Sequence, residues 1–175
     1  LDFWKKNGKP TKLVMSFHGI PKKSLIQGDP YHCECHKTGR LLAEALGLKD
    51  HMYQVCFQSR FGKAEWLKPY FSDIIKNLGV NKEENVQVIC PGFSSDCLET
   101  LEEINIEGKA IFKEHGGSKY SYIPALNHNL VWIKALSEIL SGHLSGWIDT
   151  KWLEAKEKKS SFITKQQYDK IKKNI

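Results

Sequence analysis

The sequence predicts an α/β fold, with an open, doubly wound, mainly four-stranded parallel sheet, helices on both faces and a C-terminal helical extension. Four short runs rich in β-branched and aromatic residues alternate with segments of helical periodicity, which is typical of βαβ units. The turns that end several of these runs are rich in glycine and proline. A chain of 175 residues, 41% of them hydrophobic, is long enough to bury one core.

The elements follow one another as four strand–helix pairs. Strands are expected at 12–17, 52–58, 86–90 and 120–123, and helices at 37–46, 64–78, 97–103 and 131–144. The first strand is an apolar run before a Gly-Ile-Pro turn, and the first helix, opened by residues 36–38, places leucines and alanine on one face. The second helix contains Pro69, which is tolerated only near a first turn or at a kink.

The second half of the chain carries clearer helix signals. Asp96 is the predicted N-cap of the third helix, and Glu99 stands three residues later at the spacing of a capping box. The fourth helix has large apolar residues at helical spacing. We therefore expect one α/β domain over residues 1–145 and a basic extension, read as a pair of helices, over 146–175.

The charge of the chain is concentrated at its end. Of the net charge of +6, residues 146–175 supply +4, with eight lysines against four acids. This tail is expected to be a solvated face, with peripheral contact to an anionic membrane or to a partner protein as the alternatives. A nucleic-acid partner is not expected, because base-stacking aromatics on a recognisable fold are missing. The sequence shows neither a membrane span nor a signal peptide, so a cytoplasmic location is expected.

The five cysteines do not form a disulfide pattern, and we expect reduced thiols. Two thiols and two imidazoles stand within five residues and are candidate zinc ligands: His32, Cys33, Cys35 and His36. Structural zinc sites, however, space paired cysteines by two to four residues and need a second pair elsewhere. Packing at the start of a helix is therefore the favoured interpretation, and the metal site stays an alternative.

Chemistry-bearing residues follow the first and third strands. In parallel sheets, ligands bind beyond the carboxyl ends of the strands, where His18 and the loop at 91–96 would share one rim. Glu99 is expected to face the same crevice. A histidine and a carboxylate there form a proton-handling pair or two ligands for a metal ion, although each also has a plain structural interpretation. No nucleotide-binding or serine-hydrolase motif occurs.

Several blocks of sequence are shared with one known family. They are SFHGIP at 16–21, GDPY at 28–31, QSRFG at 58–62, EWLKP at 65–69 and PGFSSDCLETLEE at 91–103. In this order and spacing they resemble ferrochelatases, the enzymes that insert ferrous iron into a porphyrin at the end of haem synthesis. The resemblance covers about residues 11–145 and is to the C-terminal half of these enzymes.

The resemblance implies roles for individual residues. His18 matches the histidine at the metal-insertion site, and Glu99 matches the glutamate paired with it across the porphyrin centre. Asp96 matches a nearby acid of the same polar path, and Trp66 falls at the pocket edge. Phe93 and Ser95, which stand in the PGFSSDCLETLEE block together with Asp96, are assigned to the porphyrin pocket and the polar path.

The implied substrates are Fe²⁺ and protoporphyrin IX or a related porphyrin, and no cofactor is required. An iron–sulfur cluster is not expected, because residues 146–175 contain no cysteine. Family members have a second, similar layer before this one, and the chain begins at Leu1 without methionine. We therefore expect the chain to be a C-terminal portion, completed by an N-terminal half or by a second copy. Alternatives are a small homodimeric cobalt or nickel chelatase and a non-catalytic tetrapyrrole- or metal-binding module.

Overall fold

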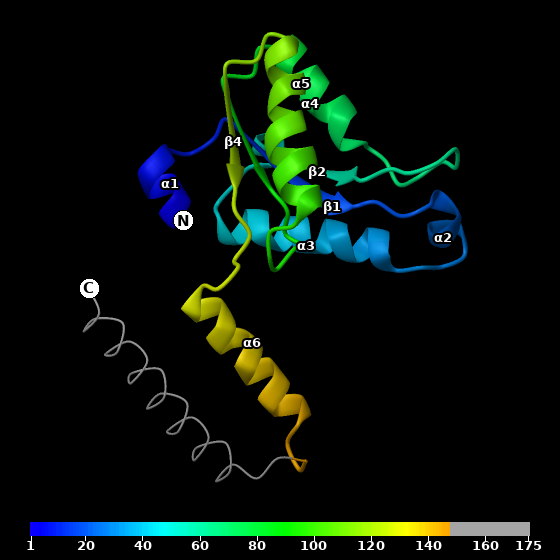
Figure 1. The fold of residues 1–175 in the computed structure, drawn as a ribbon, viewed down its shortest axis with the longest axis vertical. Helices are drawn as coiled ribbons and strands as arrows, with labels where there is room; N and C mark the ends of the chain where they lie inside the picture. Colours follow the sequence, from blue (N-terminus) through cyan, green and yellow to red (C-terminus); the bar gives the residue numbers. More distant parts are fainter. Residues whose placement is uncertain (148–175) are drawn as a thin grey trace, which may run out of the picture. The chain divides into compact units, whose positions relative to one another are not determined.

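The computed structural model describes residues 1–147 (Figure 1). The chain divides into two units, one beginning at Leu1 and the other at Asn129, which are described separately here. The predicted basic extension at 146–175 lies almost entirely outside the described residues, and its boundary with a domain at 1–145 stays a prediction. Within the described part, none of the helices combines the length and apolar character that a membrane crossing requires.

A four-stranded parallel sheet forms the centre of the first unit. Its strands are β1 (Lys12–His18), β2 (Tyr53–Gln58), β3 (Asn85–Ile89) and β4 (Lys119–Ile123), in the order β2-β1-β3-β4. The predicted open parallel sheet is confirmed. Because β1 and β3 are hydrogen-bonded neighbours that run in the same direction, the segments that follow them leave the same edge.

Helices cover both faces of this sheet (Figure 1). They are α1 (Asp2–Asn7), α2 (Lys22–Ile26), α3 (Tyr31–Ala45), the 3₁₀-helix η1 (Asp50–Met52), α4 (Phe71–Val80), the π-helix η2 (Glu99–Glu107) and α5 (Gly108–Glu114). Alternate residues of β1 point to opposite faces, so Leu13 and Met15 pack with residues of α1 and α3, whereas Val14 packs with residues of α4, η2 and α5. The core is thus two layers of side chains, one on each face.

Helix α3 begins earlier than the sequence suggested. It starts at Tyr31, and the Asp29 carboxylate accepts the backbone N–H of Tyr31 at 2.9 Å. The prediction that residues 36–38 open this helix is wrong. Gly39 and the polar residues around it interrupt the apolar periodicity, so the sequence pattern does not reveal the first part of the helix. Gly39 is buried, and a Cβ there would lie 2.5 Å from a Val55 methyl group, so the missing side chain permits the helix to approach β2.

The second predicted helix is also displaced. Residues 64–70 form no helix, and α4 starts at Phe71, two residues after Pro69. The segment instead runs back along the start of α2. Leu67 N–H donates to Ile20 O at 3.0 Å, and Trp66 forms an antiparallel bridge with Pro21. Proline therefore marks the end of an extended segment rather than a kink.

The third predicted helix is longer and wider than residues 97–103. η2 is a π-helix, and the N–H of Gly108 donates to the carbonyl of Glu103, five residues back. Asp96 does not cap it: the N-cap is Leu98, without a side-chain hydrogen bond. The capping-box prediction for Asp96 and Glu99 is therefore wrong.

The described part of the second unit contains α6 (Leu130–His143), which confirms the helix predicted at 131–144. The Asn129 side chain caps it by accepting the backbone N–H groups of Val131 and Trp132 at 2.9 and 3.4 Å. The N-cap satisfies two of the backbone donors that the first turn of a helix leaves without a partner.

Gly108, at the junction of η2 and α5, allows the closest approach of this helical segment to its neighbours. A Cβ there would lie 2.6 Å from the Tyr120 hydroxyl and 2.7 Å from the Phe71 ring. We expect Gly108→Ala to lower the free energy of unfolding by about 1–3 kcal/mol, because both neighbours are buried and held in place. Urea denaturation measures this. Gly142→Ala, in α6 with open space at its Cβ, is the control and should not destabilise; equal effects would contradict the packing argument.

Candidate functional site

His18 is the last residue of β1, at the carboxyl edge of the sheet. Its Nδ1 lies 2.7 Å from the carbonyl oxygen of Gly19, and its own carbonyl oxygen accepts the hydroxyl of Tyr31 at 2.8 Å. Because a carbonyl only accepts, Nδ1 of the neutral ring carries the hydrogen, and Nε2 keeps its lone pair. The residue is thus oriented from both sides, with Nε2 as its basic atom.

Glu99 starts η2, after the loop that leaves β3, the neighbour of β1. Its side chain is half-buried. A hydrogen bond from Cys97 lowers the pKa of Glu99, its own backbone N–H acts in the same direction, and the charge of His18 contributes too. The structure therefore brings His18 and Glu99 to one edge of the sheet, within electrostatic reach of each other.

Gln58, the last residue of β2, links the elements of this edge. Its side-chain oxygen accepts the Ser16 hydroxyl at 2.8 Å, and its side-chain nitrogen donates to the carbonyl oxygen of Glu99 at 3.0 Å. The side chain is buried. Gln58 fixes the first turn of η2 relative to β1 and β2, and it therefore positions Glu99. Sequence analysis missed this role, although a glutamine at the end of an apolar strand signals a buried polar contact.

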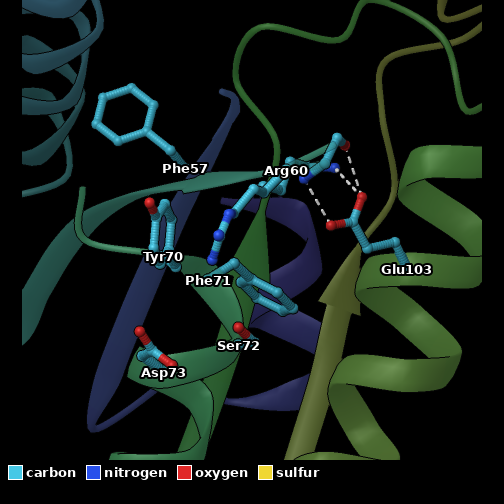
Figure 2. Close-up of a pocket in the computed structure, with 9 residues that line it drawn as sticks. Phe57, Arg60, Tyr70, Phe71, Ser72, Asp73 and Glu103 are labelled. Atoms are coloured by element: carbon cyan, nitrogen blue, oxygen red, sulfur yellow. Dashed lines mark hydrogen bonds between the residues drawn. The ribbon is translucent and has the colours of Figure 1, made fainter. Parts of the chain in front are cut away.

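Glu103 is a second residue that sequence analysis missed. Its carboxylate accepts the backbone N–H of Ser59 at 2.7 Å, the Ser59 hydroxyl at 2.6 Å and the side-chain nitrogen of Gln58 at 3.3 Å (Figure 2). These bonds join η2 to the loop after β2. They leave the guanidinium of Arg60 on the other side of the cavity, where it lies 5.1 Å from the Tyr70 ring.

Asp96 is enclosed by donors from three other segments. Its carboxylate accepts hydrogen bonds from the hydroxyls of Thr100 and Tyr122, the backbone of Ala125 and the amide of Asn127, at 2.7–3.3 Å. Partial burial raises the pKa of Asp96, but these bonds outweigh it, so the pKa lies below its ordinary value. Asp96 thus anchors the loop before Glu99 to the chain beyond β4. Its assignment to a polar path stays a prediction.

We expect Asp96→Asn to lower the free energy of unfolding by about 1–3 kcal/mol at neutral pH, because an amide cannot accept all four bonds. Since the folded-state pKa is depressed, this stabilisation is complete above the ordinary value of 3.8 and is lost as the pH falls through the lower folded value. The difference between variant and parent should therefore shrink as the pH falls below 3.8 in urea titrations. Asp50→Asn, at an exposed position, is the control; a pH-independent difference would contradict the assignment.

Three further predicted residues lie around this edge in different settings. The Trp66 ring lies 6.3 Å from the His18 ring between centroids, tilted by 46°. Phe93 packs partly buried against the core layer of α4 and α5. Ser95 is exposed. The structure therefore places Trp66 beside His18, whereas Phe93 packs against the core.

Two adjoining cavities open beside η2. One of about 300 Å³ extends between the end of β2 and the start of α4 (Figure 2). The other, of about 420 Å³, is lined by Ser59, Arg60, Phe61, Leu98, Glu99, Glu102, Glu103 and Glu107. Four of these eight residues are glutamates, against one arginine. Among the described residues, His18 is not part of this lining. The second cavity, which we call the acidic groove, suits a cation and offers apolar walls at Phe61 and Leu98.

The described residues contain no cluster of three or more His, Cys, Asp or Glu side chains arranged to hold a metal ion. Cys33 is exposed and Cys35 is buried, so the two thiols do not face a common point. The zinc site suggested for Cys33, Cys35 and His36 is not formed as a three-ligand cluster in this part of the chain.

Comparisons with known proteins agree on one family. The family model described as ferrochelatase matches residues 2–144. A curated protein of Nitrosomonas europaea, described as ferrochelatase, is 58% identical over 159 residues, which are 91% of this chain and 44% of that protein. Ferrochelatases of Methylobacillus flagellatus and Chromobacterium violaceum are 58% and 55% identical over 83% and 85% of this chain. The chain spans less than half of the length of these relatives.

Proposed function

Because this chain belongs to the ferrochelatase family, we propose that it is the C-terminal domain of an enzyme that inserts Fe²⁺ into a porphyrin to make haem. Fe²⁺ is the metal substrate, and protoporphyrin IX or a related porphyrin is the acceptor. The resemblance of the SFHGIP and CLET blocks to the C-terminal half of the family supports this placement. The remaining part of the enzyme supplies the opposite wall of the porphyrin site.

The pair of His18 and Glu99 carries the proposal. Insertion of Fe²⁺ requires that two pyrrole N–H groups lose their protons while the metal exchanges water for four ring nitrogens. His18 presents Nε2 with a free lone pair, so it accepts a pyrrole proton or holds the ion briefly. Glu99, kept ionised by its lowered pKa, stabilises the positive charge that results.

The acidic groove supports the same proposal. A path lined by Glu99, Glu102, Glu103 and Glu107 favours the approach of a divalent cation and the departure of protons. Phe61 and Leu98 offer exposed apolar surface beside these carboxylates, with 83% and 70% of their surface accessible. Exposed apolar surface next to a cation path suits a flat, apolar macrocycle, and the Trp66 ring supplies an aromatic surface beside His18.

A chimera tests the proposal. Residues 1–147 of this chain replace the aligned part of the Nitrosomonas europaea ferrochelatase, and loss of porphyrin fluorescence on addition of Fe²⁺ under anaerobic conditions reports insertion. We expect the chimera to insert iron, and the isolated chain to be inactive because it lacks the opposite wall. The unmodified relative is the positive control. A chimera that folds, as judged by circular dichroism, yet leaves the porphyrin unmetalated would contradict the proposal.

A further inference from the structure

Two histidines outside the proposed iron-insertion site share one face of α3. His32 and His36 are separated by four residues, and their ring centroids lie 4.5 Å apart at an angle of 48°. Residues four apart on an α-helix are neighbours on its surface. The two rings therefore form a pair of imidazoles near the N-terminal end of the helix.

The position of the pair is fixed by the sheet. The His32 ring stacks on Phe57 of β2 at 5.6 Å and 23°, and the His36 ring lies 6.1 Å from the same phenyl group. His32 is half-buried, whereas His36 is exposed. A rigid aromatic support below both rings limits their rotation, which reduces the entropy that a ligand would have to overcome.

We propose that His32 and His36 form a binding site for one divalent late-transition-metal ion, such as Ni²⁺, Cu²⁺ or Zn²⁺. Two imidazoles that share an ion at about 2.0–2.1 Å have ring centroids roughly 4.5–5 Å apart. The observed 4.5 Å agrees with this arrangement. Histidines at this spacing on one helix face are a recurrent metal-ligand pair, although the glutamate of the metalloprotease motif is replaced here by Cys33.

The chemistry of the donors selects the metal class. Imidazole nitrogens favour nickel, copper and zinc over magnesium and calcium. The two protein ligands leave the other positions to water, so the site exchanges its metal rather than retaining it.

The neighbouring thiols do not complete the site. Cys33 and Cys35 lie about 200° apart around the helix axis, since each residue advances about 100°. Cys35 is buried in the core layer of β1 and β2, so its thiol is not available to an ion at the helix surface. Of the four candidate ligands in this stretch of the sequence, the two imidazoles thus form the proposed site.

The site is distinct from the iron-insertion residues but close to them. The hydroxyl of Tyr31, the residue before His32, is bonded to the carbonyl of His18. His32 and Trp66 line a common cavity of about 180 Å³. The proposal does not rest on the proposed function, because it concerns imidazoles that the insertion step does not use.

Calorimetric titration of the full chain with Ni²⁺ tests the proposal. The protein carries no polyhistidine tag, its thiols are reduced, and the background substitution His18→Ala removes the half-buried imidazole at the edge of the sheet. We expect one Ni²⁺ per chain, and binding weakened roughly 10- to 100-fold by either His32→Gln or His36→Gln. His51→Gln, at an exposed histidine on η1, is the matched control and should bind like the parent.

Two outcomes of the titrations would overturn the proposal. One is equal affinity of the parent and the His36→Gln variant; this exposed side chain can be changed even where His32→Gln disturbs the stacking on Phe57. The other is loss of binding in Cys33→Ser with retention in both histidine variants, which would identify a thiol site. Electron paramagnetic resonance of the Cu²⁺-loaded chain gives an independent readout. Coupling to two nitrogens is expected, and a spectrum without nitrogen coupling would contradict the assignment.

Discussion

His18→Ala is expected to reduce kcat for iron insertion in the chimera roughly 10²- to 10⁴-fold, the range contributed by a positioned general base. The physical reason is the loss of Nε2, the basic atom that the bond between Nδ1 and Gly19 leaves free. KM for the porphyrin should change much less, because a side chain that removes protons acts mainly in the transition state. Initial rates of porphyrin metalation over a range of Fe²⁺ and porphyrin concentrations measure both quantities.

The matched control for this change is His51→Ala. His51 is an exposed histidine on η1, and its replacement should leave kcat and the unfolding temperature unchanged. Circular dichroism separates lost chemistry from lost folding in the His18 variant. A folded His18→Ala chimera with nearly parental kcat would remove His18 from the proposed mechanism.

Glu99→Gln is expected to lower kcat roughly 10²-fold or more, because the amide keeps the size of the side chain but loses the charge that stabilises a protonated His18. The measurement is the initial rate of metalation at neutral pH, where the lowered pKa of Glu99 keeps the parent carboxylate ionised.

Glu102→Gln provides the comparison. Glu102 lines the same acidic groove and is exposed, but its carboxylate does not share the hydrogen bond with Cys97 that Glu99 has. We expect a change in kcat of less than about threefold, since charges exposed to solvent are screened. Equal reductions of kcat in the two variants would show that the groove acts through its total charge and that Glu99 contributes no more than Glu102.

The sheet could be predicted because its strands are short apolar runs bounded by turn residues. β1, β3 and β4 differ by one or two residues from expectation, since in a sheet covered on both faces almost every side chain is buried. The segment before α4 could not be predicted in the same way. Trp66 and Leu67 have helical spacing with later apolar residues, but Leu67 N–H is bonded to Ile20 O, a contact between segments far apart in the sequence. Such a bond overrides local propensity.

In the candidate site, too, some features could be predicted from local sequence, whereas others depend on contacts between distant segments. His18 and Glu99 could be placed at one edge from the strand order that parallel βαβ units favour. Gln58 and Glu103 could not, because their importance depends on which loops the hydrogen bonds join. Asp96 was recognised, but its partners were not: a cap to the next turn is a local pattern, whereas Tyr122 and Asn127 are brought to it only by the complete fold.

The π-helix η2 also limits how the chain can change in length. Its backbone reaches five residues back, as the bond from Gly108 to Glu103 shows, so the coil holds more residues than an α-helix of the same height. A deletion within Thr100–Glu107 would allow tighter, stronger backbone bonding. It would also change how η2 continues into α5, so that Glu99 and Glu103 would not both keep their bonds to Gln58 and Ser59. Deletion variants in this segment should therefore misplace Glu99 and lose iron insertion, and sequences under selection for the reaction should keep this segment at constant length.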